Sequence, residues 1–264
     1  MGVPQHGQGD TVREKGSRSP GPLISVVVPT YNEEKNIEKC LHSLHSQTIP
    51  RENIEIIVVD GDSQDRTRMI AETLADKVIT QTSDGVGGAR NDGFHNAEAP
   101  IIATTDADCQ PYPGWLEATL KGFDDDAVIA VTGFLDPSDW ADITGAEKLA
   151  YETLFRLSNV LLVVLSTLGK YHLCGANSAF RKTTFLETGG YLPLTYADDT
   201  ELYKRIKHKG RVKLLDDMII HYSVRRIKKM GLLNYIRLVF KMEWDVSIMN
   251  RKPMKGGYAR QTYE

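Results

Sequence analysis

Two aspartates with one residue between them, Asp106 and Asp108, are the side chains of this chain best suited to chemistry. They follow the apolar run 100–105, which predicts a buried strand. Positions i and i+2 share one side of a strand, so both carboxylates can converge on one cation or polar ligand. A hard divalent cation takes oxygen ligands and often brings a phosphate with it. The pair alone leaves two interpretations open, a metal site and an ordinary Asp-rich turn.

The elements that must position this pair form a repeating pattern. Three earlier apolar runs also predict buried strands, at residues 23–28, 54–59 and 77–80. A helical pattern follows each run, and this order without hairpin signals predicts an α/β fold with a mostly parallel central sheet flanked by helices. Polar segments follow the strands, at residues 29–32, 60–63, 84–91 and 106–108. We expect them to gather along the sheet edge where such folds bind nucleotides.

The second half of the chain is less regular. Its patterns predict strands at 127–132, 212–215 and 218–222, a loop or edge strand at 175–180, and helices at 146–168, 198–209 and 227–249. Helix caps are expected at Asn32 and at Ser63 or Asp65. We also expect Asp198 to cap the helix that it begins, with Glu201 completing an arrangement like a capping box.

Composition limits the class of protein. The 264 residues are 41% hydrophobic and 25% charged with a formal net charge of -3, which is ordinary for a globular protein and gives no nucleic-acid signature. Three widely spaced cysteines form neither a disulfide framework nor a zinc pattern, which predicts a reducing cytoplasm. No signal peptide is visible, and no apolar stretch reaches the ~18 residues of a membrane span. Residues 160–168 are expected to form a buried helix or a surface that touches lipid.

We predict three parts in the chain. Residues 1–22 carry few apolar side chains and are expected to be a disordered tail, and residues 23–224 are expected to form one domain. Residues 225–264 predict a basic helical appendage, with ten Lys and Arg against three Asp and Glu. Basic residues lie there among Ile236, Phe240 and Trp244, which is typical of a helix on an anionic membrane. A helix that covers the sheet edge with solvated lysines fits the same segment.

The common phosphate-binding loops are missing from this sequence. Residues 85–88 do not match Gly-x-Gly-x-x-Gly, and no Gly-x-x-x-x-Gly-Lys-Ser/Thr segment occurs. A bound nucleotide would therefore have its phosphates neutralised by a metal ion that aspartates hold.

Four motifs in order resemble the family 2 glycosyltransferases, which have the GT-A fold. They are ISVVVPTYNEE at 24–34, IVVDGDSQDRT at 57–67, GARNDG at 88–93 and TDAD at 105–108. Three further segments, at 174–181, 189–191 and 197–202, extend the likeness to about residues 23–222. The resemblance implies a GT-A (nucleotide-diphospho-sugar transferase) fold and a metal-dependent, inverting transfer of a sugar from a UDP- or GDP-linked donor to an acceptor hydroxyl, with Mn²⁺ or Mg²⁺ as the cofactor.

The resemblance also implies roles for individual residues. Those that would bind the donor or lie beside it are Pro29, Thr30, Glu33, Asp60, Asp62, Arg90, Asn91, Asp106 and Asp198. Asp108 would ligate the metal that bridges the donor diphosphate, and His221 would be a further metal ligand. Asp199 would be the general base, a role that typically contributes ~10²–10⁴-fold in rate. Structural roles stay open for Glu33 at a helix N-terminus, for Arg90 as a surface residue and for His221 as a lone histidine.

The chain departs from the family pattern in one motif. Where the family usually has Val-Asp-Asp-Gly-Ser, Gly61 and Asp62 are exchanged here, so the sequence leaves uracil and guanine open as the base. The Gln-x-x-Arg-Trp motif of processive synthases is missing, which favours transfer of a single sugar to a lipid-linked or polysaccharide glycan. A nucleotidyltransferase and a non-catalytic nucleotide-sugar or glycan-binding module are the alternatives. The expected location is cytoplasmic, with peripheral contact to the membrane.

Overall fold

An eight-stranded sheet organises the chain, of which the computed structural model describes residues 21–251. The strands lie in the order β3-β2-β1-β4-β7-β6-β8-β5. Their bounds are β1 (Ile24–Thr30), β2 (Ile54–Asp60), β3 (Lys77–Thr80), β4 (Ile101–Thr104), β5 (Cys109–Pro111), β6 (Val128–Ser138), β7 (Ser178–Arg181) and β8 (Arg211–Ser223). Neighbours in β3-β2-β1-β4 and the pair β6–β8 are parallel, whereas β7 and β5 run antiparallel to their neighbours. The mostly parallel sheet is therefore confirmed.

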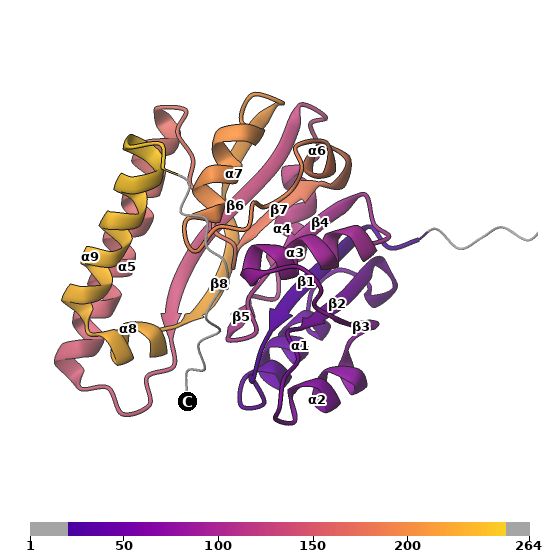
Figure 1. Cartoon of the computed structure of the whole chain (residues 1–264), viewed down its shortest axis with the longest axis horizontal. Helices are drawn as coiled ribbons and strands as arrows, with labels where there is room; N and C mark the ends of the chain where they lie inside the picture. The colour runs from indigo at the N-terminus through magenta and orange to yellow at the C-terminus, as the bar shows by residue number, and fades with distance from the viewer. Residues whose placement is uncertain (1–20, 252–264) are drawn as a thin grey trace, which may run out of the picture.

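Helices cover both faces of this sheet (Figure 1). The helices that pack on one face are α1 (Ile37–His45), α2 (Thr67–Leu74) and α4 (Trp115–Gly122). Those on the other face are α3 (Gly85–Asn96), α6 (Lys182–Glu187) and α7 (Asp198–Ile206). The remaining helical elements are η1 (Arg51–Asn53), α5 (Gly145–Thr167), α8 (Arg225–Met230), α9 (Leu232–Glu243) and η2 (Trp244–Ile248). Helices α5, α8 and α9 lie together at one end of the sheet, on the left in Figure 1.

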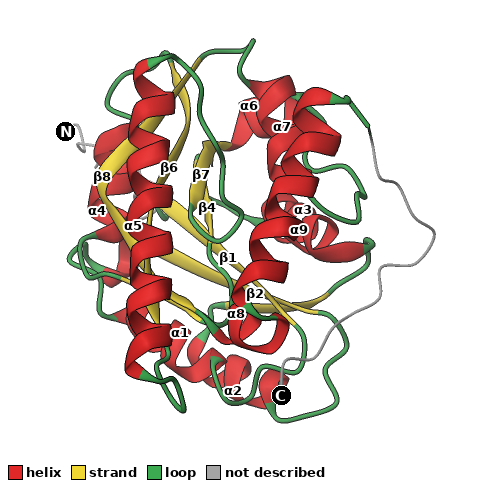
Figure 2. Cartoon of the chain, turned by 90° about the vertical axis from the view of Figure 1, so that its left-hand side faces the viewer, coloured by secondary structure: helices red, strands yellow, loops and turns green. Residues whose placement is uncertain are grey.

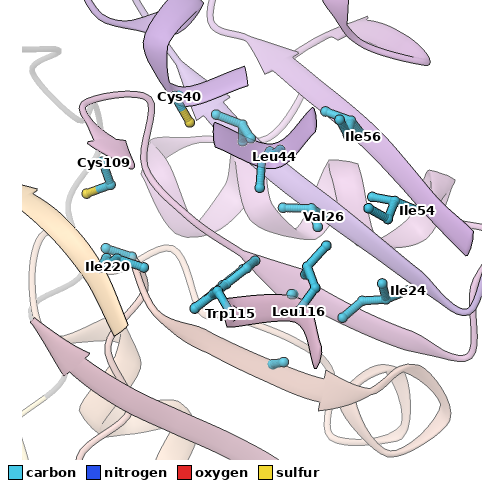
Figure 3. Close-up of a cluster of buried hydrophobic side chains, with 14 of the residues drawn as sticks. Ile24, Val26, Cys40, Leu44, Ile54, Ile56, Cys109, Trp115, Leu116 and Ile220 are labelled. Atoms are coloured by element: carbon cyan, nitrogen blue, oxygen red, sulfur yellow. The ribbon is translucent and has the colours of Figure 1, made fainter. Parts of the chain in front are cut away.

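Side chains of β1 alternate between two hydrophobic cores, as the period of a strand requires. Val26 packs with Trp115 of α4 on one face, and Val27 packs with Phe94 of α3 on the other. Figure 3 shows the first core, where β1 and β2 meet α1 and α4. Full burial of each such side chain contributes ~1.5–3 kcal/mol. These two cores fix the carboxyl ends of β1, β2 and β4, from which the polar segments start.

Two predictions about strands are wrong. The segment 175–180 was expected to be a loop or edge strand; residues 175–177 do form a loop, but β7 lies inside the sheet between β4 and β6 instead of at its edge. The short strands expected at 212–215 and 218–222 are one strand, β8, with an irregular register opposite Thr132 and Phe134. The antiparallel pairing of β7 with both neighbours satisfies its backbone on two sides, which the sequence pattern could not indicate.

The expected cap at Asn32 is also wrong. Asn32 has a φ of 52° and its Oδ1 accepts the backbone N–H of Gln64 at 2.8 Å, so it ties two loops together. Asn36 takes the N-cap position of α1, without a capping hydrogen bond from its side chain. At α2, Oδ1 of Asp65 accepts the N–H of Thr67 at 2.9 Å, although Arg66 has the N-cap position.

Helix α5 differs most from expectation. It has 23 residues, and an 18-residue window with a mean hydropathy of 1.4 makes it long and apolar enough to cross a membrane. Only 11% of that window is buried in the structure. By length and composition alone, a span-length helix is therefore present, contrary to expectation. Of the two alternatives for residues 160–168, the buried helix is wrong. The charged residues of α5 all precede Leu157, so only the second half of the helix has a continuous apolar pattern in the sequence.

The C-terminal segment packs against the rest of the chain. Val224 and Ile227 are buried with Tyr151 and Phe155 of α5, and the hydroxyl of Tyr196 donates to Asp245 of η2 at 2.8 Å. Within the described residues, packing is thus continuous across the boundary predicted after residue 224. The expected tail, except for residues 21 and 22, and the end of the expected appendage lie outside the described residues.

Candidate active site

The polar segments after β1, β2, β3 and β4 gather at the carboxyl edge of the sheet. β1 lies between β2 and β4, so the strand order changes direction there. Ligands of open α/β sheets bind in the crevice outside such a switch point. Five carboxylates share this region and are held by two arginines, Arg90 and Arg225: Glu33, Asp106, Asp108, Asp198 and Asp199.

Arg90 is buried in the crevice and faces three carboxylates. Its Nη2 donates to Oδ1 of Asp106 at 2.8 Å. Its Nη1 lies 3.7 Å from Asp198 and 3.9 Å from Asp199. The side chain is only 4% exposed, so the surface role that the sequence left open for Arg90 does not hold. Arg90 joins the end of β4 to the start of α7 and fixes these carboxylates relative to one another.

Two glycines make room for this cluster. A Cβ at Gly175 would lie 2.3 Å from Cζ of Arg90, and a Cβ at Gly87 would lie 2.7 Å from Oδ2 of Asp198. The N–H of Gly175 also donates to Oδ2 of Asp199 at 2.9 Å. Gly175 therefore fixes Asp199 and admits Arg90 at the same point.

The adjacent carboxylates of α7 are hard to ionise together. Burial, and then the charge of Asp199, raise the pKa of Asp198 to about 7, against the opposing effect of Arg90. Burial also raises the pKa of Asp199, whereas Arg90 and the N–H of Gly175 lower it. A raised pKa suits a carboxylate that accepts a proton near neutral pH.

Arg225 holds a second group of carboxylates. Its Nε donates to Oδ2 of Asp108 at 2.9 Å, and its Nη2 donates to Oε1 of Glu33. Glu33 and Asp108 are 13% and 21% exposed, so this ion-paired group is largely shielded from water. Burial raises the pKa of Asp108 to about 6, although Arg225 opposes that rise. Glu33 thus contacts Arg225, which is distant in the sequence, in addition to any stabilisation of the helix N-terminus that follows it.

A pocket of about 210 Å³ adjoins Asp108. Oxygen ligands line it from Asp108, Gln110, Ser138, Asp139 and Ser223, beside Asn36, Lys39 and Cys109. Such hard donors fit Mg²⁺ or Mn²⁺. Among residues 21–251, no three His, Cys, Asp or Glu side chains are grouped to hold a metal by themselves. The pocket therefore fits a cation that takes its remaining ligands from a diphosphate and water, as Mg²⁺ usually does.

His221 does not lie at this pocket. Its ring contacts that of Tyr112 at a tilt of 37°, with centroids 4.5 Å apart, and its Nδ1 is 3.4 Å from Oδ2 of Asp136. It lines a neighbouring cavity that shares Gln110 with the Asp108 pocket. The structure therefore does not bring His221 and Asp108 together on one ion, and the predicted ligand role of His221 gains no support from this geometry.

The residues expected around the nucleoside lie at the ends of β1 and β2. Thr30 pairs in register with Asp60, directly after Pro29, and its buried Oγ1 has no hydrogen-bond partner. Oδ1 of Asp60 accepts the hydroxyl of Ser63 at 2.6 Å, so this carboxylate also shapes its own loop. Asp62 is exposed with a φ of 70°. Their contacts with a nucleoside stay predictions.

The exchange of Gly61 and Asp62 has a local reason. The N–H of Gly61 donates to the carbonyl of Thr30 at 2.8 Å. A Cβ at Gly61 would lie 3.0 Å from Oε1 of Gln81 and 3.3 Å from that carbonyl. A side chain at 61 would therefore be crowded, whereas position 62 is open.

Asn91 and Asp198 make contacts or take positions within the fold that the sequence did not predict. Nδ2 of Asn91 donates to the carbonyl of Tyr191 at 2.8 Å, and its Oδ1 accepts the N–H of Tyr191 at 2.9 Å. Both polar ends of Asn91 are used within the fold, and its position beside the nucleotide stays a prediction. Asp198 is the first residue of α7, not its cap, because Ala197 takes the N-cap position with a φ of 55°. Glu201 pairs with Arg205 at 2.7 Å instead of completing a capping box.

Two residues at the site were not predicted, Arg225 and Gln110. Arg225 is the first residue of the expected basic appendage. Its contacts span 117 residues to Asp108 and 192 residues to Glu33. Gln110 lies two positions after Asp108 and lines the same pocket. The spacing of two along a strand was the signal that could have found Gln110.

Solved structures with similar folds define the class. The mannosyltransferase PcManGT from Pyrobaculum calidifontis, solved with GDP-Man and Mn²⁺, superposes with a TM-score of 0.64 at 27% identity. The match covers 84% of this chain and 65% of that one. The architecture is the GT-A fold of glycosyltransferases, as expected.

The family follows from the sequence comparison. Residues 25–189 match the model of glycosyl transferase family 2, and the chain belongs to that family. The glycosyltransferase AglE of Haloferax volcanii is 37% identical over 44% of this chain and 41% of its own length. A Methanococcus voltae dolichyl N-acetyl-α-D-glucosaminyl phosphate 3-β-D-2,3-diacetamido-2,3-dideoxy-β-D-glucuronosyltransferase is 32% identical over 38% of this chain and 34% of its own. The chain thus spans less than half the length of either relative.

Proposed function

We propose that this chain is the catalytic domain of a metal-dependent, inverting glycosyltransferase that moves one sugar from a nucleotide-diphosphate donor to an acceptor hydroxyl. The observation that carries the proposal is the joint position of Asp106 and Asp199, which buried Arg90 holds at the switch point of the sheet. The Asp108 pocket adjoins the same strand end. The GDP-Man and Mn²⁺ in PcManGT support a nucleotide-sugar donor and a divalent metal for this chain too.

Donor binding is assigned to the ends of β1, β2 and β4. Thr30, Asp60 and Asp62 would bind the nucleoside, with Asp106 at the ribose. Asp108, with Gln110 beside it, would hold the Mn²⁺ or Mg²⁺ ion. When bound there, the ion would stabilise the charge of the departing diphosphate as a Lewis acid.

Proton transfer is assigned to Asp199. The acceptor oxygen attacks the anomeric carbon, the bond from that carbon to the diphosphate oxygen breaks, and the hydroxyl proton passes to the carboxylate of Asp199. A single displacement of this kind inverts the anomeric configuration. The hydrogen bond from Gly175 to Asp199 would keep the carboxylate oriented for this step.

The acceptor is proposed to be lipid-linked, and the domain to lie on the cytoplasmic face of a membrane. The Methanococcus voltae relative is named for an acceptor carried on dolichyl phosphate. Helices α5 and α9 both lie on the side that faces the viewer in Figure 2. Ile236, Phe240, Trp244 and Ile248 form an exposed stripe there, each four residues after the last. Basic residues of the same segment suit anionic lipids.

A thermal-shift panel of UDP, GDP and their sugar conjugates, each with and without Mn²⁺, tests the donor assignment. We expect stabilisation by one nucleotide series that depends on Mn²⁺. No metal-dependent shift with any compound would overturn the assignment. Release of nucleoside diphosphate in the presence of a membrane lipid extract then separates an enzyme from a binding module, which would bind the donor without consuming it.

A further inference from the structure

A cavity of about 500 Å³ opens next to the Asp108 pocket and has no role in the reaction described so far. The ends of β6 and β8 and the middle of α5 line it, with polar side chains that include Asp136, Glu152, Arg156 and His221. It shares Gln110 and Ser138 with the Asp108 pocket. A ligand in this cavity would therefore lie beside the donor diphosphate.

Arg156 is the charged group of this cavity that has no partner. Within residues 21–251, its exposed guanidinium makes no hydrogen bond or ion pair. The two carboxylates have partners of their own. Asp136 accepts a hydrogen bond from the hydroxyl of Tyr112 at 2.7 Å. Oε1 of Glu152 lies 3.9 Å from Nζ of Lys148, one turn earlier on α5. Nδ1 of His221 is buried there without a hydrogen-bond partner. The cavity thus has an available cation for an anionic ligand.

An apolar stripe of α5 begins where Arg156 stands. Residues four apart share a helix face, so Val160 and Val164 follow Arg156 along that face, 59% and 50% exposed. Leu157 and Leu161 widen the stripe and are 64% and 56% exposed. Exposed apolar surface next to a charged pocket is the arrangement that binds an amphiphile by its head and its chain.

We propose that the cavity binds the phosphate head group of an acceptor carried on a prenyl chain, with Arg156 as the phosphate ligand and the α5 stripe as the surface for the chain. The planar guanidinium binds phosphate through two parallel hydrogen bonds, which an ammonium group does not reproduce. The inference rests on the proposed function in one respect, because it takes this ligand to be the acceptor. It names the acceptor's anionic group and the residue that recognises it.

Isothermal titration of the full chain with three probes tests the site: farnesyl phosphate, farnesol and inorganic phosphate. We expect farnesyl phosphate to bind at least tenfold more tightly than either of the other two. Arg156→Gln should weaken its binding about tenfold, and Arg156→Lys should recover part of the loss. Lys209→Gln is the control for loss of one positive charge, because Lys209 is exposed and lies outside the cavity lining and outside helices α5, α8 and α9. It should stay within about twofold of the wild type.

Three results would overturn the inference. One is unchanged affinity for farnesyl phosphate in Arg156→Gln, and another is an equal loss in Lys209→Gln, which would indicate general charge attraction. The third is inorganic phosphate binding as tightly as farnesyl phosphate, which would make this a free-phosphate site. Titration with UDP and GDP plus Mn²⁺ separates this inference from the proposed function. Nucleotide binding without farnesyl phosphate binding rejects the cavity alone, and the reverse result rejects the transferase proposal while the cavity assignment stands.

Discussion

Arg225 donates a hydrogen bond from Nε to Oδ2 of Asp108 at 2.9 Å, so the proposed metal ligand is paired with a cation of the protein itself. The same guanidinium contacts Glu33 of the β1–α1 loop. Because Arg225 is the first residue of α8, this contact joins the C-terminal helices to the donor side of the crevice. A metal ion at Asp108 would have to compete with the guanidinium for the same carboxylate.

Removing this arginine should strengthen metal binding. We expect Arg225→Gln to bind Mn²⁺ about tenfold more tightly than the wild type in the absence of nucleotide, since a charge-assisted hydrogen bond contributes ~1.5–3 kcal/mol. Isothermal titration with MnCl₂ measures the change, with Arg237→Gln as the control for loss of one positive charge. Weaker Mn²⁺ binding in Arg225→Gln would mean that Arg225 organises the site instead of competing for it.

The contact between Arg225 and Asp108 could not be predicted from the sequence. The ends of the first four strands could be predicted, because each is a local change from an apolar run to polar residues. The same reasoning brought Asp106 and Asp108 to the sheet edge. In the sequence, Arg225 is one of several basic residues in a basic segment. Only the path of β8 in the fold brings it close to Asp108.

The ionisation of Asp198 should affect stability with a definite sign. Its pKa is raised from the ordinary 3.8 to about 7, mainly by burial. A carboxyl of this kind contributes most stability below pH 4 and loses that contribution as pH rises through 7, because the folded state binds the proton more tightly. The side chain in Asp198→Asn cannot ionise, so this variant does not lose stability in that way as the pH rises. Its melting temperature should therefore exceed that of the wild type by more at pH 8 than at pH 4.5.

The advantage of Asp198→Asn in melting temperature should be about 2–4 °C larger at pH 8 than at pH 4.5. This is the change that ~1 kcal/mol produces in a domain of 150–250 residues. Thermal unfolding followed by circular dichroism at both values measures it. An advantage of Asp198→Asn that is equal at the two pH values, or larger at pH 4.5, would contradict the raised pKa.

Gly175→Ala should disrupt the cluster around Arg90. The added methyl would lie 2.3 Å from Cζ of Arg90, and overpacking of a buried site typically costs 1–3 kcal/mol. We expect a lower melting temperature and at least tenfold lower transfer activity, because Asp199 is held at the same glycine. Gly145→Ala is the matched control, since a Cβ there meets no atom within 4 Å. Equal stability and activity of the two variants would refute the role of Gly175.

The apolar faces of α5 and α9 should bind anionic lipid. Leu161→Asp and Phe240→Asp each place a charge on a side chain that is now 56% or 67% exposed. We expect the double variant to lose most of its co-sedimentation with vesicles of phosphatidylglycerol and phosphatidylcholine. Met69→Asp, at a residue 57% exposed on α2 and away from these helices in Figure 1, should sediment like the wild type. Equal sedimentation of the double variant and Met69→Asp would exclude this surface.

Contacts made by side chains, as distinct from strand ends, were the part that the sequence could not indicate. Asn91 belongs to a motif that resembles a nucleotide contact, yet both ends of its amide bind the backbone of Tyr191, 100 residues away. His221 lies near the end of β8, and its ring faces Asp136 and Tyr112. In both cases the partner comes from a distant segment, so no local pattern identifies it.

The most direct test of the proposed chemistry compares Asp199→Asn with the wild type in sugar transfer and in donor binding. Transfer is measured as nucleoside diphosphate released with Mn²⁺ and a membrane lipid extract, using the donor that the thermal-shift panel selects. We predict that Asp199→Asn loses at least about a hundredfold in transfer rate while its donor affinity stays within about threefold, because a general base contributes ~10²–10⁴-fold. Transfer at the wild-type rate by Asp199→Asn would contradict the assignment of Asp199 as the base.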